Sequence, residues 1–309
     1  MTQIFWHDAA LSHETPPGHP ERILRAERIT SALREMDGLD WRDAPAADRS
    51  EILRCHPESH LAAIEAAAPE EGTRQIDGDT FISPGSVDAA YHAVGGCCAA
   101  VDAVVAGECK SAFVAMRPPG HHAEQEKAMG FCFFGNAAIA AKHGLDHCGL
   151  SRVAVLDFDV HHGNGTQALL WDEPRTFFVS SHQSPLWPGS GEKSERGAHD
   201  NVLNVPLPPM SGGVEARSAW GNTVFPRLDE FAPELIIISA GFDAHADDPL
   251  ANLNWQEEDF VWLTREICAI ATKHAQGRVV STLEGGYDLD ALTRSVVAHV
   301  EALKEHENG

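Results

Sequence analysis

Two aspartates and a histidine alternate along the segment Asp-Phe-Asp-Val-His at positions 157–161, where an apolar run ends in a glycine-containing loop. In an extended chain, side chains at positions i, i+2 and i+4 project to one face, so Asp157, Asp159 and His161 are expected to converge beyond the end of a strand. Crowded carboxylates in an apolar setting repel each other unless a cation neutralises them. Capping of a following helix accounts for one aspartate but not for three polar groups on one face. The spacing therefore predicts a metal site.

A second acidic segment supplies a further ligand. The apolar run 235–240 is followed by Asp243, and open α/β sheets bind ligands beyond the carboxyl ends of such strands. We expect Asp243 to meet Asp159 and His161, and this donor set leaves a coordination position open for water, as in catalytic zinc sites. Iron(II) and cobalt accept the same donors, so zinc is favoured but the metal stays open. The polar neighbours are assigned to the loop or a helix cap, namely His245, Asp247 and Asp248.

Tandem histidines follow another apolar run, in the segment Arg-Pro-Pro-Gly-His-His at positions 117–122. Imidazole titrates near neutral pH, so His121 and His122 suit general acid and base catalysis beside a metal. A histidine pair by itself is a modest signal, and the predicted metal site strengthens it. Asp157 and Asn164, on the metal-binding segment, are available to orient the two rings.

A tyrosine follows two glycines after the apolar run 279–283. The phenol of Tyr287 can donate a hydrogen bond to an oxyanion as negative charge develops, although a buried core tyrosine on a turn fits this segment alone equally well. Phe131 and Trp187 are either ordinary core aromatics or, if they flank the metal, the walls of an apolar slot for an aliphatic chain.

Apolar, β-rich runs alternate with longer helical patterns, which predicts a parallel α/β sheet. The chain shows no internal repeat and no low-complexity linker, so we expect a single domain over residues 1–309. The longest irregular stretch, 181–201, contains Trp187 and is expected to line a binding site. The predicted strands are 112–116, 153–158, 176–180, 235–240 and 279–283, and the predicted helices are 21–36, 84–106, 212–230, 257–275 and 288–305.

Composition narrows the class of protein further. The chain has 43% hydrophobic residues, and neither a run of about 18 apolar residues nor a signal peptide is visible, which predicts no membrane association and a cytoplasmic location. Its seven cysteines include no CxxC pair and are expected to be reduced. The net charge of -23 argues against nucleic-acid binding and mildly favours cationic ligands, although solubility or a saline habitat explains it equally well.

Taken together, the motifs RPPGHHA, GFCFFGN, LDFDVHHGNGTQ, SPLWPGSG, GFDAHADDPL and LEGGYDL resemble the zinc-dependent histone deacetylase superfamily, which includes acetylpolyamine amidohydrolases. The resemblance extends from Gly18 to Tyr287 and implies the single-domain arginase/deacetylase-like fold, a mostly parallel sheet with helices on both faces. It implies hydrolysis of an N-acetyl amide, with His122 as the general base and His121 as electrostatic support or proton shuttle.

The resemblance also implies a role for each matching residue. Zinc would be bound by Asp159, His161 and Asp243, Asp157 would orient His121, Asn164 would contact His122, and Tyr287 would hold the oxyanion. Substrate would contact Phe131, Gly130, Trp187, Leu250 and Asp79. A structural potassium ion would be bound by Asp157, Asp159, His161 and Ser180, with the Ser181 carbonyl nearby.

Four positions depart from common family patterns. Asn164 stands where many members have aspartate, which leaves His122 with less carboxylate support and a lower pKa. Trp187 replaces a usual phenylalanine and is expected to change the width of the tunnel. Glu284 matches the class II and bacterial branch. Leu250 follows Asp-Pro where a polyamine-selective animal branch has a glutamate gatekeeper.

Two other functions remain open from the sequence. A binuclear-metal ureohydrolase shares the expected sheet but needs more bridging aspartates and no catalytic tyrosine, and a catalytically silent acetyl-ligand binder would not need Tyr287. The expected substrate is a small molecule or peptide with an N-acetyl amide, such as acetyl-lysine or an acetylpolyamine, and the acidic balance favours a cationic remainder. The sequence leaves the oligomeric state open, including a homo-oligomer whose partner subunit narrows the tunnel mouth.

Overall fold

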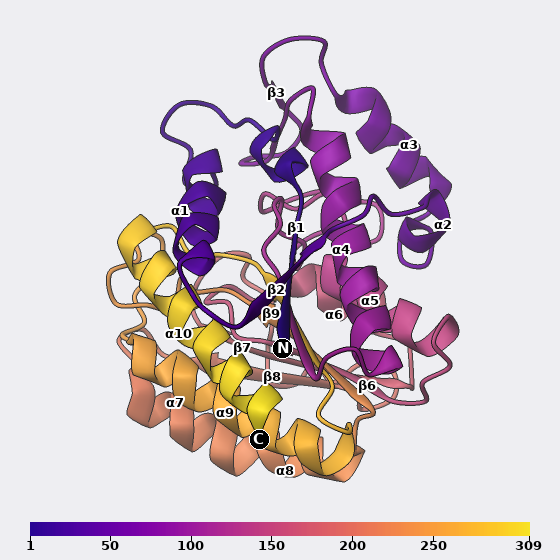
Figure 1. Ribbon diagram of the computed structural model, residues 1–309. Helices are drawn as coiled ribbons and strands as arrows, with labels where there is room; N and C mark the ends of the chain where they lie inside the picture. The colour runs from indigo at the N-terminus through magenta and orange to yellow at the C-terminus, as the bar shows by residue number, and fades with distance from the viewer.

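The computed structural model describes all residues 1–309 and contains one central sheet of eight strands, all paired in parallel (Figure 1). The α/β fold class predicted from the sequence is confirmed. Across the sheet the strands are β2 (Leu39–Asp43), β1 (Thr2–Trp6), β5 (Ser111–Val114), β10 (Val279–Leu283), β9 (Leu235–Ala240), β6 (Val153–Asp157), β7 (Thr176–Gln183) and β8 (Val202–Leu207).

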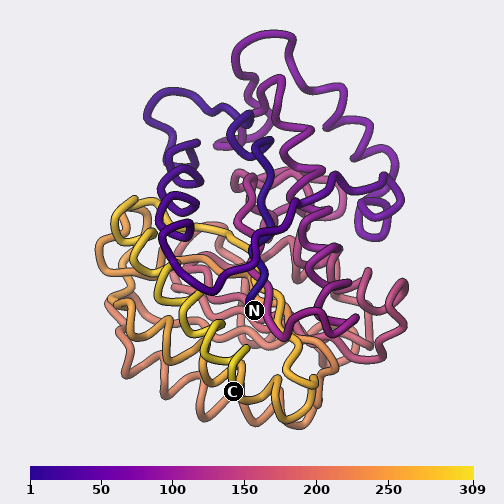
Figure 2. The backbone as a smooth tube through the Cα atoms, viewed as in Figure 1, coloured from indigo at the N-terminus to yellow at the C-terminus, as the bar shows by residue number.

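Helices cover both faces of the sheet, as the tube in Figure 2 also shows. On one face α4 (Ser86–Ala106) packs on β5, β10 and β1, and α5 (Asn136–Asp146) and α6 (Asn164–Leu170) pack on the neighbouring strands. The other face is covered by α9 (Glu257–His274) and α10 (Leu289–Asn308), against which α1 (Ile23–Arg34) and α8 (Phe225–Phe231) pack, and by α7 (Gly213–Ala219). The smaller elements are η1 (Asp8–Leu11), α2 (Arg49–Ile52), α3 (Glu58–Ala67) and a two-stranded sheet of β3 (Arg74–Gln75) and β4 (Phe81–Ile82).

Burial explains why the central strands are the most apolar. Every residue of β9 and β10 is buried, because helices cover both of their faces. The edge strand β2 alternates polar and apolar residues, and none of its residues is fully buried. Helix α4 is long and apolar enough to span a membrane, but 72% of its most apolar window is buried inside the protein, where it forms part of the core.

Several elements differ from the sequence-based expectation. Strand β7 continues to Gln183, so the irregular stretch begins later than residue 181. The helix expected over 212–230 is interrupted by a π-helical segment, η2 (Trp220–Val224). Pro226, at the start of the following α8, cannot donate a backbone hydrogen bond back to this segment. The sequence did not single out β1, β2 and β8, which lie toward the two edges of the sheet and have polar residues or a proline among their apolar ones.

Strand order determines where chemistry can occur. Strands β9 and β10 come late in the chain but insert between β5 and β6. Because all strands are parallel, the carboxyl ends of these four neighbours lie at one edge of the sheet. The segments that follow them contain the tandem histidines, the metal-site residues and the tyrosine. Topology therefore gathers groups that are far apart in the sequence.

Candidate active site

Asp159, His161 and Asp243 form a compact buried cluster beyond the ends of β6 and β9. Their ligand atoms all lie within 4.8 Å of one another. The Nδ1 atom of His161 is 3.1 Å from Asp159 Oδ1 and 3.1 Å from Asp243 Oδ2, so one nitrogen faces both carboxylates. The structure therefore brings together the three side chains predicted as metal ligands.

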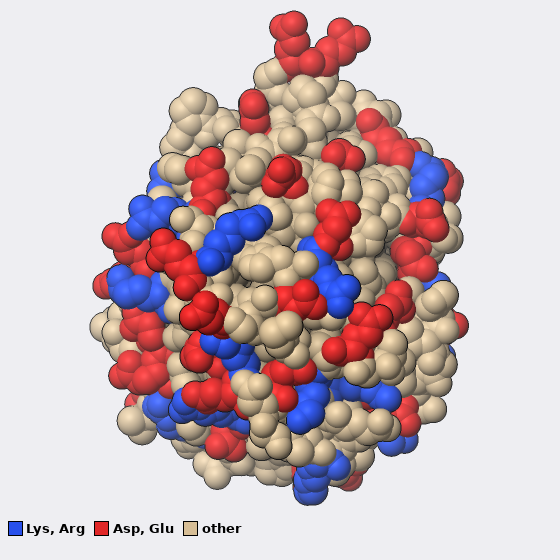
Figure 3. Space-filling view, in the orientation of Figure 1, with Lys and Arg blue, Asp and Glu red and all other residues tan.

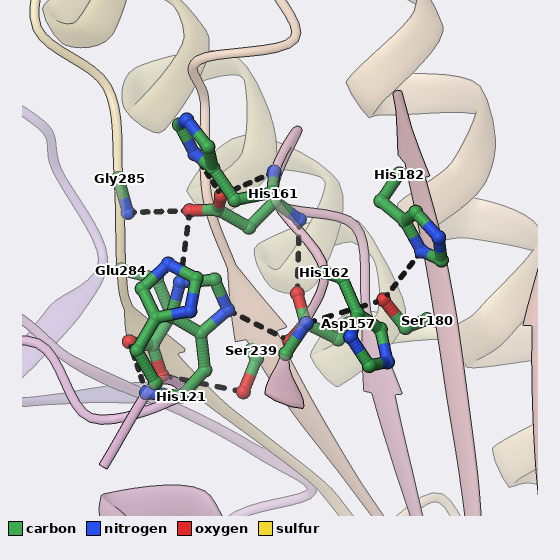
Figure 4. Close-up of polar contacts among 12 residues, drawn as sticks. His121, Asp157, His161, His162, Ser180, His182, Ser239, Glu284 and Gly285 are labelled. Carbon is green, nitrogen blue, oxygen red and sulfur yellow. Dashed lines mark hydrogen bonds and ion pairs between the residues drawn. The ribbon is translucent and has the colours of Figure 1, made fainter. Parts of the chain in front are cut away.

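Backbone groups and glycines shape this cluster. Gly285 donates its N–H to Asp159 Oδ2 at 2.9 Å (Figure 4). The N–H of Val160 donates to Asp243 Oδ1 at 2.8 Å. A Cβ atom at Gly241 would collide with the Asp159 carboxylate, and one at Gly285 would collide with the Asp243 carboxylate. Glycine at these two positions allows the backbone to approach the cluster closely.

Electrostatics favour a cation at this cluster. Burial raises the pKa of Asp243 to about 7, and the Asp159 carboxylate adds to this shift. Burial alone would lower the pKa of His161, but hydrogen bonds with Asp159 and Asp243 outweigh it and raise that pKa to about 10. Among the protein groups alone a proton on His161 balances the carboxylates, and a divalent ion bound to the same atoms neutralises them more fully. The donor set fits a metal ion.

His143 belongs to two other groups of potential ligands, and their geometry differs. Its Nδ1 lies 2.8 Å from Glu51 Oε2 and its Nε2 lies 2.8 Å from Asp102 Oδ1. Arg54 also binds both oxygens of Glu51, at 2.7 and 3.0 Å. These contacts are those of an ion-pair network that joins α2, α4 and α5. The cysteines beside it are Cys98 and Cys148.

The rings of the tandem histidines are tilted by 41° to each other, with centroids 3.9 Å apart, and they have different partners. His121 Nδ1 lies 2.9 Å from Asp157 Oδ2, and His122 Nδ1 lies 2.8 Å from Asn164 Oδ1. Burial by itself would lower the pKa of both rings. For His121 the Asp159 and Asp157 carboxylates outweigh burial and raise its pKa well above the ordinary value. For His122 the nearby His121 reinforces burial, so its pKa falls well below that value.

Glu284 anchors the loop that bears these histidines, a contact that the sequence did not reveal. Its Oε2 accepts the N–H groups of Gly120 at 2.7 Å and His121 at 3.2 Å, and Ser239 donates its hydroxyl to Oε1 (Figure 4). Burial raises the pKa of Glu284 to about 7, against the opposing effect of His121. The sequence analysis used Glu284 only to assign the chain to the class II and bacterial branch, and gave it no structural role.

Two residues that the sequence did not assign to the site hold the turn around Tyr287. Asp248 accepts the N–H of Tyr287 at 2.7 Å and that of Leu250 at 2.9 Å, so this loop aspartate also positions the tyrosine. Buried Arg25 donates to the carbonyls of Glu284 and Gly286 on either side of the turn. Its guanidinium carbon lies 5.1 Å from the centre of the Tyr287 ring. In the sequence, Asp248 and Arg25 are isolated polar residues outside any repeating pattern, so nothing there predicted these contacts.

The Tyr287 phenol keeps its proton at neutral pH. Burial raises its pKa well above the ordinary value, and the Asp243 carboxylate acts in the same direction. The side chain is 8% exposed and lines the cavity that leads to the cluster. It is therefore a hydrogen-bond donor facing the site.

A cavity of about 450 Å³ opens above the cluster. Trp187 stands edge-on to His122, with ring centroids 4.6 Å apart, and the Phe131 and Tyr287 rings are 5.8 Å apart. Asp79 Oδ1 accepts a hydrogen bond from the N–H of Gly130 at 3.2 Å, which links two segments of the cavity lining. The lining includes all five predicted substrate contacts (Asp79, Gly130, Phe131, Trp187, Leu250), the site residues His122, His161 and Tyr287, and five residues not predicted (His19, Pro20, Gly78, Phe81, Leu186).

The predicted potassium ligands lie on or just after two neighbouring strands, β6 and β7. Asp157 on β6 is paired in register with Ser180 on β7. The Ser180 hydroxyl is 3.0 Å from His182 Nδ1, and the Ser181 hydroxyl accepts a hydrogen bond from Trp220 at 3.1 Å (Figure 4 shows the Ser180 contact). These residues are adjacent, and their role in binding potassium stays a prediction.

The fold and site define a class of α/β proteins with a buried Asp-His-Asp cluster at the carboxyl edge of a parallel sheet. Residues 19–303 match the histone deacetylase domain. The chain belongs to the histone deacetylase family, as its motifs predicted.

Named relatives support the same assignment. A histone deacetylase-like amidohydrolase of Pseudomonas aeruginosa is 40% identical, over 87% of this chain and 73% of that protein. A probable deacetylase of Archaeoglobus fulgidus is 37% identical, over 94% of this chain and 82% of that protein. The crystal structure of the HDA15 HD domain superposes with a TM-score of 0.91 at 29% identity, covering 98% of this chain and 91% of that domain. Membership in a family of deacetylases makes this protein a hydrolase.

Proposed function

We propose that this protein is a zinc-dependent deacetylase that hydrolyses the amide bond of an N-acetylated amine. One observation supports the proposal: His161 of the Asp159–His161–Asp243 cluster lines the same cavity as His122 and Tyr287, and this cavity opens to solvent. A metal-binding group, a neutral base and a phenol donor together can supply the activation, proton transfer and oxyanion stabilisation of metal-assisted amide hydrolysis. An apolar wall beside them suits an aliphatic stem.

The cluster would hold the metal through two carboxylate oxygens and the Nδ1 of His161. When bound, zinc supplies Lewis acidity to the acetyl carbonyl and lowers the pKa of a water molecule toward about 7. Asp157, Ser180 and their neighbours would hold a structural potassium ion behind this cluster.

His121 and His122 would have different roles in the reaction. His122 has a depressed pKa and is neutral near pH 7, so it can take a proton from the attacking water and later deliver it to the leaving amine. His121, paired with Asp157, keeps its proton and stabilises negative charge. The Tyr287 phenol donates to the acetyl oxygen as it becomes negative, a contribution of about 3 kcal/mol for such a donor.

The substrate remainder is proposed to be cationic. Among the cavity-lining residues, Asp79 at the mouth is the acidic side chain, and no lysine or arginine lines the cavity. On the face shown in Figure 3, acidic side chains are spread over the surface with fewer basic ones among them, in keeping with the net charge of -23. Acetyl-lysine peptides and acetylpolyamines both fit this description.

A substrate panel tests the proposal. Acetyl-lysine peptides, acetylputrescine, acetylcadaverine and acetylspermidine would be compared by kcat/KM with the zinc-loaded protein. We expect acetate release from at least one of them and a preference of more than about tenfold for one group, since a mismatched remainder commonly costs 1–3 kcal/mol. Release of urea from a guanidino compound with two metal ions per chain would instead show a ureohydrolase. Tight binding of acetyl amides without turnover would show a silent binder.

A further inference from the structure

Asn164 is held between His122 and a glutamate that lies outside the cavity lining. Its Oδ1 is 2.8 Å from His122 Nδ1, and its Nδ2 is 2.7 Å from Glu124 Oε1. Asn164 is 7% exposed, so this amide depends on protein partners for its hydrogen bonds. The three side chains therefore form a short chain of hydrogen bonds that begins at the protein surface and ends at the active site.

Hydrogen-bond chemistry gives this chain a direction. A carboxylate only accepts, so the amide group facing Glu124 must be the NH₂. The Oδ1 of Asn164 then faces His122 and can only accept, so Nδ1 of His122 must carry the proton. In a neutral imidazole the other nitrogen, Nε2, then has the lone pair. The carboxylate of Glu124 thus favours one tautomer of His122 through the intervening Asn164 amide.

We propose that Glu124 is a positioning residue that acts through Asn164 to hold His122 in the tautomer whose Nε2 can accept a proton. The inference deepens the proposed function and rests on it, because it assigns the base used in amide hydrolysis. It also explains how His122 is supported although Asn164 replaces the usual aspartate: the supporting carboxylate is that of Glu124, which reaches His122 through the Asn164 amide. The chain is then Glu124, Asn164, His122.

The loop around Glu124 leaves its side chain open to replacement. Its backbone N–H donates to the Lys127 carbonyl at 2.9 Å, independently of the carboxylate. The side chain is only partly buried and forms no ion pair. Glu124→Met, which removes the acceptor and preserves side-chain length, is therefore expected to fold.

A cycle of variants tests the proposal. Without Glu124, the Asn164 NH₂ keeps only two long contacts, to the His122 carbonyl at 3.5 Å and the Met129 sulfur at 3.6 Å, which orient the amide less firmly. Glu124→Met should therefore lower kcat by about tenfold with KM and metal content unchanged. In Glu124→Met/Asn164→Asp, a carboxylate accepts directly from His122 Nδ1, and kcat should return to within about threefold of wild type. The matched control is Glu126→Met, because that exposed glutamate of the same loop contacts only Ser59, and it should change kcat by less than about twofold.

A spectroscopic measurement separates this proposal from the proposed function. The ¹⁵N shifts of His122, identified by their loss in His122→Ala, should show the Nδ1–H tautomer in the wild type and a mixture in Glu124→Met. If kcat of Glu124→Met stays within twofold of wild type, if Asn164→Asp fails to rescue it, or if the tautomer is unchanged, the role of Glu124 is refuted. A wild type that deacetylates no substrate but shows the expected tautomer change would refute the deacetylase proposal alone.

Discussion

Two histidines of this protein each lie between two carboxylates, and their environments differ in how the imidazole meets them. His161 directs a single nitrogen at both Asp159 and Asp243, at 3.1 Å each. His143 directs one nitrogen at Glu51 and the other at Asp102, at 2.8 Å each. A nitrogen that faces two carboxylates at once suits a shared metal ion, whereas two nitrogens that face different carboxylates suit separate hydrogen bonds. Residue type and proximity alone therefore do not define a metal site.

The nearby cations strengthen this contrast. Arg54 binds the Glu51 carboxylate in the His143 network, so charge there is balanced by protein groups. The carboxylates of Asp159 and Asp243 form no ion pair with lysine or arginine. A bound cation stabilises buried carboxylates most where no lysine or arginine already neutralises them.

The largest expected effect comes from removing a metal ligand. Asp243→Asn should reduce bound zinc from one per chain to none and lower kcat/KM by at least about 10³-fold, because the Lewis acid is lost. Metal analysis and acetate release measure both effects, and chelation of the wild type should reproduce them reversibly. Asp102→Asn is the matched change in the His143 network and should preserve zinc and activity. Loss of zinc from that variant would erase the contrast between the two clusters.

The next effect separates metal binding from reactivity. Tyr287→Phe removes only the phenol hydroxyl, so kcat should fall by about 10²–10³-fold while zinc remains bound. The chain has one other tyrosine, Tyr91, whose hydroxyl binds Glu65 at 2.6 Å on another part of the molecule. Tyr91→Phe should keep full activity. Equal turnover by the two variants would remove the tyrosine from the mechanism.

A smaller effect, on stability, is expected from the His143 network. His143→Ala removes a buried ring and two hydrogen bonds to carboxylates, and should lower the free energy of unfolding by about 2 kcal/mol. Urea denaturation measures this loss, and kcat of the remaining folded protein should be unchanged. A loss of zinc in place of stability would indicate that His143 is a metal ligand after all.

The smallest effect is a pH dependence in the same network. Burial alone would raise the pKa of Glu51, but hydrogen bonds from Arg54 and His143 outweigh it and lower the pKa from 4.5 to about 2. The stability that this carboxylate contributes is thus fully present above about pH 4.5 and is lost as the pH falls toward 2. Glu51→Gln should lower the melting temperature by a few degrees at pH 7 and progressively less below pH 4.5. A melting-temperature difference that does not change with pH would show that Glu51 acts through packing.

Much of the site could be anticipated because it lies on residues next to strand ends. Asp159 and His161 alternate after one apolar run and Asp243 follows another, and parallel pairing brings such ends to one edge. The partners of His121 and His122 were also expected. Contacts made by isolated polar residues could not be anticipated, since Asp248, Arg25 and Glu284 reach Tyr287 or the histidine loop from positions with no repeating pattern.

The sequence by itself determined the fold class, the family and the residue types available for chemistry, because apolar periodicity and motif spacing are local properties of the chain. Tertiary structure alone decided which polar groups meet and in what direction. The contacts between Glu124 and Asn164, and between Glu51 and His143, join segments 40 and 92 residues apart. Hydrogen bonds and ion pairs depend on distances of a few ångströms and on angles, and only the packed sheet and its helices set these.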